Sequence, residues 1–323
     1  MKKLLVFVFT LILVSSCGFK DDKLTLRQST GNMNHVLIVM NNSEWQGKAG
    51  DALRDIIASP VLGLPQEENQ FSVHQVPPNT FTRLFKANRN LLFVGVDKQD
   101  AFNVSTNLYA DPQIAMTILG KDEASLIEQI KKHKEKIVSV FKNGDLKFFQ
   151  RKLTKKHLDS EKIKTLKSLN VSMKIPSEYR LVKDSGEFLW LRNETINDVS
   201  KNILVYSAPI NTDNDLMGSN IVAMRDTIGK RFIPGGPEGS HMITEAAYSP
   251  HIKSTQLSGN DAFEVRGKWE VKGDFMAGPF LNYSVIDEKN DRMLVVEGFT
   301  YAPNINKRDY MFELEAILKT LKF

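Results

Sequence analysis

A stretch without proline that is rich in Lys, Glu and Leu, from residue 122 to about residue 156, separates two parts of the chain with different patterns. This composition predicts a long helix, which we expect to break at Asn143 and Gly144. Before it, the apolar runs "HVLIVM" (residues 35–40) and "NLLFVGV" (residues 90–96) predict buried strands. After it, near Leu169, the chain changes to strand patterns separated by turns.

The second part of the chain predicts an antiparallel meander followed by a helix. The segments "DAFEVRGKWEV", "PFLNYSVID" and "RMLVVEGFTY" have strand patterns, and the last two are joined by the turn residues "EKND". Residues 306–322 predict an amphipathic helix. We therefore expect an α+β protein of two tandem or related halves, each with a mainly antiparallel sheet and a terminal helix. The predicted domains are residues 35–160 and residues 169–323.

The beginning of the chain has the composition of a secretory signal peptide. Two lysines precede an apolar run (residues 4–14), and two serines stand directly before Cys17. The run is too short to cross a bilayer as a helix, which needs about 20 residues. Because "VSSC" is typical of a bacterial lipobox, we expect residues 1–16 to be removed and Cys17 to carry lipid, including palmitate. Residues 17–34 would then form a polar leader. The alternative is a signal peptide without lipidation and with a chance cysteine.

Cys17 is the single cysteine among 323 residues. Its lipidation would leave no thiol for a disulfide, a nucleophile or a metal site. Removal of the signal peptide takes away two lysines, so the formal charge falls from +5 to about +3. This charge is too small to indicate a nucleic-acid partner. No spacing of histidines predicts a metal site, and no motif indicates a cofactor.

Several blocks of the sequence carry a resemblance to a known family. They are "SEWQGKAGDALRDIIASPVLGLPQEENQF", "VPPNTFTRLFKANRNLLFV", "RFIPGGPEGSHMITE", "RGKWEVKGDFMAGPF" and "YAPNINKRDYMFELEAIL". Over nearly the whole mature chain they resemble an uncharacterised family of Bacteroidetes lipoproteins, known as a domain of unknown function. The resemblance implies a lipoprotein of the outer membrane and gives no activity.

The same resemblance implies a role for the residues that follow the cysteine. Lys20, Asp21 and Asp22 are similar to a signal that exports lipoproteins of that bacterial group to the outer face of the outer membrane. We therefore expect exposure on the cell surface, with the periplasmic face of the outer membrane as the alternative. The three residues are also compatible with a solvated leader between anchor and domain.

One segment combines residues that are used in catalysis. "FIPGGPEGSHMITE" places a loop rich in Gly and Pro before His241 and Glu245. A helix that begins at Ser240 would bring the two side chains one turn apart, where both could face a metal or a substrate proton. Two residues do not complete such a site, and loops of this composition more often simply turn the chain. We therefore regard a structural loop as the favoured interpretation.

Two further segments predict surface functions. "GDFMAGPF" contains Phe275, Met276 and Phe280 among turn residues, so an exposed apolar loop there would be a partner contact. "DTI" resembles a short O-glycosylation motif of Bacteroidetes with Thr227 as the acceptor. We expect the three tryptophans to pack in the core rather than to form a ligand platform.

Two classes of function follow. In the first, the protein is a lipid-anchored binding or assembly module that holds a protein or glycan partner at the cell envelope. In the second, it is an envelope hydrolase whose site is assembled from residues far apart in the sequence. We favour the first class, because no catalytic signature such as Gly-x-Ser-x-Gly occurs.

Overall fold

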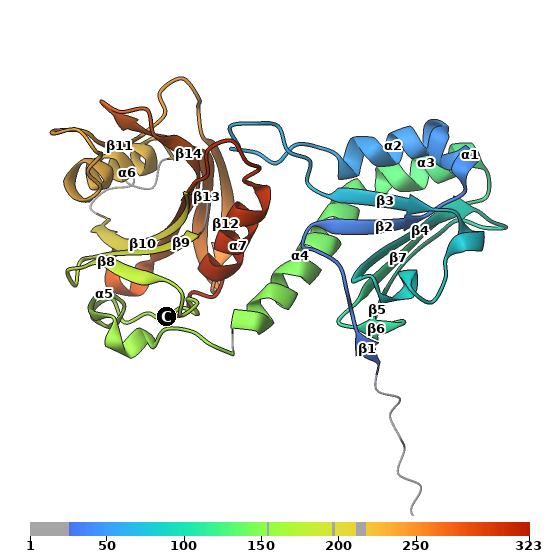
Figure 1. The fold of residues 1–323 in the computed structure, drawn as a ribbon, viewed down its shortest axis with the longest axis horizontal. Coiled ribbons are helices and arrows are strands. Elements are labelled where there is room, and N and C mark those ends of the chain that lie inside the picture. The colour runs from blue at the N-terminus through green and yellow to red at the C-terminus, as the bar shows by residue number, and fades with distance from the viewer. Residues whose placement is uncertain (1–25, 154, 196–197, 211–217) are drawn as a thin grey trace, which may run out of the picture.

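The computed structural model describes residues 26–153, 155–195, 198–210 and 218–323. Two domains lie side by side, the N-terminal one in blue and green and the C-terminal one in yellow and red (Figure 1). Each domain combines a sheet with helices, which confirms the α+β class and the two-domain organisation.

The N-terminal domain is built on a five-stranded sheet with the strand order β3-β2-β4-β7-β5. Helices α2, α3 and α4 cover one of its faces (Figure 1), and β1 pairs with β6 beside it. The elements are β1 (Arg27–Gln28), β2 (His35–Val39), α1 (Asn42–Gln46), α2 (Lys48–Ile57), β3 (Ser72–Val76), β4 (Asn90–Val96), β5 (Ala101–Thr106), β6 (Ala110–Asp111), β7 (Ile114–Gly120), α3 (Glu123–Lys132) and α4 (Lys134–Leu153).

The N-terminal sheet differs from the expectation that each half would have a mainly antiparallel sheet. Strands β3, β2, β4 and β7 pair in parallel, and β5 alone is antiparallel in this sheet. The physical reason is visible in β2, where Val36 and Ile38 pack under the helices while Leu37 and Val39 pack on the opposite face. Strands buried on both faces have continuous apolar runs and are typical of parallel sheets.

The long helical stretch breaks at a different residue from the one predicted. His133 separates α3 from α4, and its ring stacks on Phe102 with 3.9 Å between centroids. Asn143 and Gly144 lie inside α4. A Cβ atom on Gly144 would lie 2.8 Å from Cγ1 of Ile114 in β7, so the glycine allows the helix to approach the sheet closely.

The C-terminal domain is built on an eight-stranded sheet in which every described pairing is antiparallel. Its main path is β11-β13-β14-β15-β10-β9-β8, and β12 also pairs with β13. The elements are α5 (Lys164–Ser168), β8 (Arg180–Asp184), β9 (Phe188–Thr195), β10 (Val199–Pro209), α6 (Gly218–Phe232), β11 (His241–Thr244), β12 (His251–Leu257), β13 (Asn260–Lys272), β14 (Ala277–Asp287), β15 (Arg292–Tyr301) and α7 (Arg308–Leu318).

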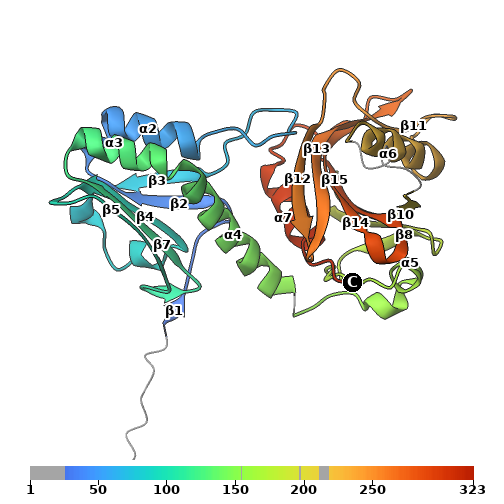
Figure 2. The same ribbon diagram turned by 180° about the vertical axis from the view of Figure 1, so that it is seen from behind.

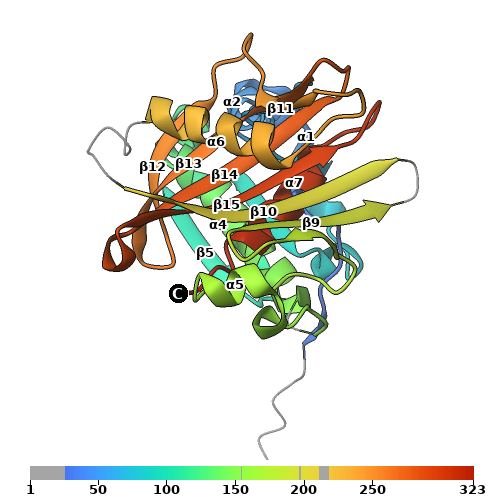
Figure 3. The ribbon, with the colours of Figure 1, turned by 90° about the vertical axis from the view of Figure 1, so that its left-hand side faces the viewer.

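Both faces of this sheet are covered, with α6 on one side and α5 on the other (Figure 3). The face under α6 buries Trp190 and Trp269, and the opposite face packs against α5 and α7. Trp45 packs against the core of the N-terminal domain. The two sheets have different topologies, so the domains are tandem units rather than copies of one unit.

A residue of the N-terminal domain caps helix α7 of the C-terminal domain and so joins the two domains. The carboxylate of Glu68, in the N-terminal domain, accepts hydrogen bonds from the backbone N–H groups of Lys307 (2.6 Å) and Arg308 (3.0 Å) at the start of α7. Helix α7 has no side-chain cap of its own. A negative charge at a helix N-terminus satisfies unpaired N–H groups and interacts favourably with the helix dipole.

Apolar packing continues the same interface. Leu146 of α4 packs against Phe312 and Ala316 of α7, and Nε2 of Gln150 donates to the carbonyl of Ala316 at 3.0 Å. Leu64, in the loop after α2, is part of the core of the C-terminal domain. These contacts fix the position of α4 relative to α7.

Replacement of Glu68 by alanine tests the cap. We expect Glu68→Ala to lower the free energy of unfolding by about 2 kcal/mol, because one buried and one partly buried N–H group at the start of α7 lose a charged acceptor. Urea denaturation monitored by tryptophan fluorescence gives this value. The neighbouring Glu67 is exposed, so Glu67→Ala is the matched control and should change the free energy by less than about 0.5 kcal/mol. Equal effects of the two variants would contradict the assignment.

Candidate functional site

A cleft of about 790 Å³ lies between the two domains. The end of α2, the loop that follows it and α4 form one wall, and β12, β13 and α7 form the other. Helices α4 and α7 meet between the two sheets (Figure 2). Ligand pockets commonly have volumes of about 300–1,000 Å³ and often lie at domain interfaces. The cleft is therefore the candidate ligand site.

Five charged side chains from both domains meet in the cleft, and we call them the cleft cluster: Lys142, Glu264, Arg266, Glu315 and Lys319. The carboxylate of Glu315 accepts hydrogen bonds from Arg266 and Lys319, each at 2.8 Å. Nζ of Lys142 lies 3.9 Å from the same carboxylate. Nε of Arg266 donates to Glu264 at 2.6 Å. Three cations and two carboxylates give the cluster a formal charge of +1.

Regular secondary structure places these residues. Glu264 and Arg266 alternate with Val265 along β13 and therefore point to the same face of the sheet. Glu315 and Lys319 are four residues apart at the end of α7, where one turn of helix brings their side chains together. The N-terminal domain supplies Lys142 from α4.

The loop after α2 closes one side of the cleft by contacting β13 directly. Gly63 has a φ of +83°, and a Cβ atom there would lie 3.1 Å from the backbone of Arg266. Glycine adopts this left-handed conformation without strain and leaves room for the close approach. The neighbouring Leu62 is 52% exposed and lines the cleft. The loop therefore connects the wall formed by the N-terminal domain to strand β13 of the C-terminal domain at Arg266.

The electrostatic environment keeps both carboxylates ionised. Burial alone would raise the pKa of Glu315, but Arg266, Lys142 and Lys319 outweigh it and hold the pKa well below its usual value. Burial would also raise the pKa of Glu264, and Arg266 lowers it below the ordinary value. Burial would lower the pKa of Arg266, but the two carboxylates raise it. Glu315, Glu264 and Arg266 are therefore held in their charged forms.

Lys142 is the one cation of the cluster that donates no hydrogen bond to a described residue. An ammonium group has three donors, and its 3.9 Å separation from Glu315 is too long for a hydrogen bond. No other described residue accepts a hydrogen bond from Lys142, and 27% of its side chain is exposed. Burial lowers the pKa of Lys142, while Glu315 opposes this shift. The cleft thus presents a partly desolvated cation to an incoming group.

Tyr283 supports the cluster from β14. Its hydroxyl donates to Glu264 at 2.9 Å, and its ring is buried in the core of the C-terminal domain. Burial raises the pKa of Tyr283 far above its usual value, and the nearby Glu315 and Glu264 add to this effect. The phenol therefore stays protonated and fixes the orientation of the Glu264 carboxylate.

The structure does not bring His241 and Glu245 together as the sequence suggested. Residues 241–244 form strand β11 instead of the first turn of a helix, because they pair with β13 from His241↔Lys272 to Thr244↔Trp269. Four positions of a strand span about 13 Å, compared with about 6 Å for four positions of a helix. Neither residue lines the cleft.

The apolar loop is also smaller than the sequence suggested. Phe275 is fully exposed at the turn between β13 and β14. Met276 is partly buried against the core under α6, and Phe280 is 1% exposed within that core. Phe280 points inward because β14 buries nearly all of its residues. The three residues therefore do not form one apolar surface.

The remaining sequence predictions concern the beginning of the chain and α6. Cys17, Lys20, Asp21 and Asp22 lie outside the described residues. Thr227 is exposed on α6, and its hydroxyl donates to the carbonyl of Ala223 at 2.9 Å. Its glycosylation stays a prediction.

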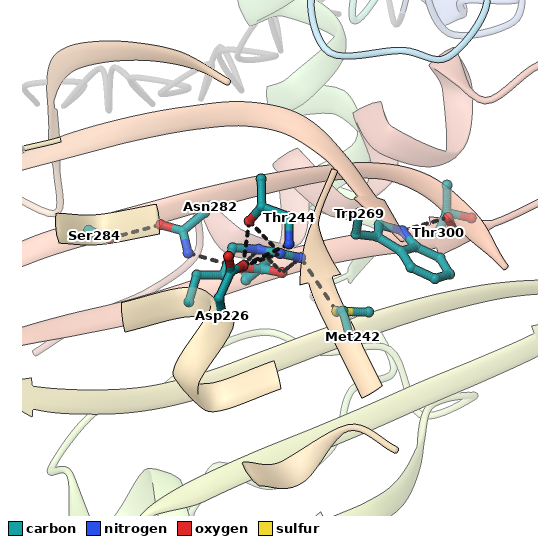
Figure 4. Close-up of polar contacts among 9 residues, drawn as sticks. Asp226, Met242, Thr244, Trp269, Asn282, Ser284 and Thr300 are labelled. Carbon is teal, nitrogen blue, oxygen red and sulfur yellow. Dashed lines mark hydrogen bonds and ion pairs between the residues drawn. The ribbon is translucent and has the colours of Figure 1, made fainter. Parts of the chain in front are cut away.

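A second polar cluster lies inside the C-terminal domain. Arg225 of α6 forms hydrogen bonds of 2.8–3.1 Å with Glu297 of β15. Arg225 also donates to Thr244 and Met242, and Asn282 donates to Glu297. Figure 4 shows Asp226, Met242, Thr244 and Asn282 gathered at this cluster. Arg225 is 4% exposed and Glu297 is 0% exposed, so this cluster attaches α6 to the sheet and does not face solvent.

Within the described ranges, His, Cys, Asp and Glu side chains form no group of three or more that would hold a metal ion. Among the same residues, no helix is long and apolar enough to cross a membrane.

Sequence reasoning missed the cleft cluster because its members come from three distant segments. The local signals were present: "EVR" places two opposite charges on one face of a strand, and "ELEAILK" places Glu315 four residues before Lys319. Each pattern alone is common on protein surfaces. Only the packing of α4 against α7 shows that Lys142 joins them.

Replacement of Glu315 tests the electrostatics of the cleft. We expect Glu315→Gln to lower the free energy of unfolding at pH 7 by about 3 kcal/mol, because Arg266 is left without one of its buried carboxylates. The folded-state pKa of Glu315 is below its ordinary value of 4.5. Its stabilisation is therefore complete above about pH 5 and is lost as the pH falls through the folded pKa, where variant and wild type should converge. Urea denaturation at several pH values measures both effects.

The matched control is an exposed ion pair. Glu187 contacts Arg231 at 2.9 Å, with side chains 58% and 60% exposed. Glu187→Gln should change the free energy of unfolding by at most about 1 kcal/mol, because water screens such pairs. A difference between Glu315→Gln and wild type that stays constant at acidic pH would contradict the assigned pKa shift.

Comparisons with known proteins cover nearly the whole chain. A family model described as a domain of unknown function, DUF8532, matches residues 29–154. No curated protein sequence matched the chain. One similar solved structure is the crystal structure of LpqN, involved in cell envelope biogenesis of Mycobacterium tuberculosis, with 11% identity, a TM-score of 0.30, and coverage of 47% of this chain and 82% of that chain. A second family model, the domain of unknown function DUF4837, matches residues 157–320. Because this match spans slightly more than half of the sequence, the chain belongs to the DUF4837 family.

Proposed function

We propose that the protein is a lipid-anchored component of the cell envelope that binds an acidic ligand in the cleft between its two domains. The observation that carries the proposal is the cleft cluster, which has a formal charge of +1 and contains a cation without a hydrogen-bonded acceptor among the described residues. A carboxylate or phosphate of the ligand would accept hydrogen bonds from Lys142 and neutralise the formal charge of +1 of the cleft cluster.

The shape of the cleft restricts the size of the ligand. Ile56, Val61 and Leu62 line one side of it together with Val138 from α4, so apolar surface lies beside the charged residues. A volume of about 790 Å³ accommodates a small molecule or a short segment of a longer chain. Of the partners considered from the sequence, a segment of an acidic envelope glycan or an acidic peptide fits these properties.

The location in the proposal rests on the beginning of the sequence. The apolar run before Cys17 and the "VSSC" motif support lipid attachment at this cysteine. Each buried methylene of an acyl chain contributes about 0.8 kcal/mol, so several chains hold a protein firmly on a bilayer. We extend the proposal to the outer membrane of a Bacteroidetes cell and, through Lys20, Asp21 and Asp22, to its outer face.

A hydrolytic function receives less support from the geometry. The carboxylates of the cleft cluster, Glu264 and Glu315, have pKa values below their ordinary ones. A general acid in a pair of carboxylates needs a raised pKa so that it holds a proton near neutral pH. Both side chains are instead engaged by Arg266. The arrangement favours binding over acid catalysis.

Replacement of Cys17 tests the anchor. We expect Cys17→Ser to move the protein from the membrane fraction to the soluble fraction and to abolish incorporation of labelled palmitate, because serine cannot form the thioether that carries the lipid. Ser15→Ala is the matched control, since it keeps a small residue ahead of the cysteine and should leave both properties unchanged. Unchanged palmitate labelling in Cys17→Ser would contradict the anchor.

Photo-crosslinking in living cells tests the ligand site. A photoreactive amino acid at Leu62 would face the cleft, whereas one at Leu181 on β8 would have the same 52% exposure away from it. We expect a specific adduct from Leu62 and none from Leu181. Mass spectrometry of the adduct should identify a ligand that carries a carboxylate or a phosphate.

A second substitution links the adduct to the cleft cluster. Lys142→Gln should reduce its yield at least about tenfold, because the ligand loses a charge-assisted hydrogen bond. Lys147 is exposed on the same helix, and Lys147→Gln should leave the yield unchanged. A neutral ligand, or equal yields in the two variants, would contradict the proposal.

A further inference from the structure

The corner of the N-terminal domain where the described chain begins carries three exposed leucines. Leu26 is 39% exposed, Leu84 is 76% exposed and Leu108 is 48% exposed. Exposed leucines that stand singly are ordinary, but a group of them marks an interaction site. We call this surface the anchor-side patch and define it by Leu26, Leu84 and Leu108 together with the basic residues Arg27, Arg83 and Lys86.

Contacts between three chain segments bring these residues together at one corner of the domain. Strand β1 pairs in parallel with β6, with Arg27 opposite Ala110, so Leu26 lies beside the segment of Leu108. The guanidinium of Arg27 donates to the carbonyl of Arg83, which precedes Leu84. Figure 1 shows β1, β5 and β6 together at the lower edge of this domain.

Polar contacts through Gln113 hold the segment of Lys86 against the segment of Tyr109. Nζ of Lys86 lies 5.1 Å from the centroid of the Tyr109 ring. Nε2 of Gln113 donates to the carbonyl of Lys86 at 2.8 Å, and Oε1 of the same side chain accepts from the N–H of Tyr109 at 2.8 Å. The patch is therefore a fixed feature of the fold rather than the meeting of independent loops.

The charge of the patch selects the type of partner. The described parts of these segments contain three basic residues and one acidic residue, the exposed Asp111. Apolar side chains surrounded by Lys and Arg fit the boundary between acyl chains and anionic headgroups, where the leucines enter the apolar layer and the cations meet phosphate.

The position of the anchor selects the same partner. Leu26 follows Cys17 by nine positions, and nine residues extend at most about 30 Å. A lipid on Cys17 would therefore hold this corner close to the bilayer and give the patch a high effective concentration there.

We propose that the anchor-side patch contacts an anionic membrane surface. This inference rests on the proposed function only because the proposed anchor at Cys17 places the patch near a bilayer. Binding of lipid by the patch itself does not require the acyl chains on Cys17. The contact orients the N-terminal domain on the bilayer.

Vesicle sedimentation tests the proposal without the lipid anchor. The mature chain, residues 17–323 with Cys17→Ser, is mixed with vesicles of phosphatidylglycerol and phosphatidylcholine or with vesicles of phosphatidylcholine alone. We expect binding to the anionic vesicles and much weaker binding to the neutral ones. Arg83→Gln should weaken the anionic binding about fivefold, the effect of one cation near a charged surface. Leu84→Glu should weaken it at least tenfold, since it removes an inserted side chain and adds a negative charge.

Two variants on the other domain are the controls. Leu181 is also an exposed leucine and Arg231 is an exposed arginine, so Leu181→Glu and Arg231→Gln should leave binding unchanged. Circular dichroism and the melting temperature verify that every variant is folded. Absence of binding to anionic vesicles, or equal losses in Leu84→Glu and Leu181→Glu, would overturn the proposal. Because this protein carries no lipid, either result is independent of the Cys17 anchor.

Discussion

The hydrogen bonds from the start of α7 to the Glu68 carboxylate are the contact on which the arrangement of the two domains depends. Each domain has its own sheet and its own core, so packing within a domain does not fix their relative position. The directional cap of α7 fixes that position together with the packing of α7 against α4. These contacts hold the walls that the two domains contribute to the cleft in a defined arrangement.

The cleft cluster has an energetic cost that its own contacts do not fully offset. Glu315 is buried and receives two hydrogen-bonded cations, which is the arrangement that a buried carboxylate requires. Lys142 is different, because burial lowers its pKa and no described residue accepts its hydrogen bonds. Natural proteins retain such local inconsistencies mainly at functional sites. The imbalance is thus an argument for a ligand, since the arrival of an anion would satisfy the donors of Lys142 and oppose the lowering of its pKa by burial.

Several elements could be predicted from the sequence because their signals are local. The apolar run of β4 and the turn before β15 were located correctly, since each depends on neighbouring residues. The direction of the N-terminal strands was not predicted correctly, although burial of β2 on both faces leaves a continuous apolar run that indicates a parallel sheet. His241 was misassigned because pairing with β13 overrode a loop composition compatible with a helix start. Arg266 and Lys142 could not be associated by any local pattern, as they meet only through the domain interface.

The anchor-side patch and the cleft lie at different ends of the N-terminal domain, and this arrangement determines how the cleft would be oriented relative to a membrane. The anchor-side patch lies beside β1 and β6, whereas the loop that enters the cleft begins at the end of α2 and the α4 wall lies against α7. In Figures 1 and 2, β1 and β6 project from the sheet away from α2. A domain attached through the patch would therefore direct the α2 end of the cleft away from the bilayer. Electrostatics supports the same orientation, because anionic headgroups that attract Arg27 and Arg83 would repel an acidic ligand, and the repulsion declines over a Debye length of about 8 Å at physiological salt. A cleft beyond that distance remains accessible to an anion.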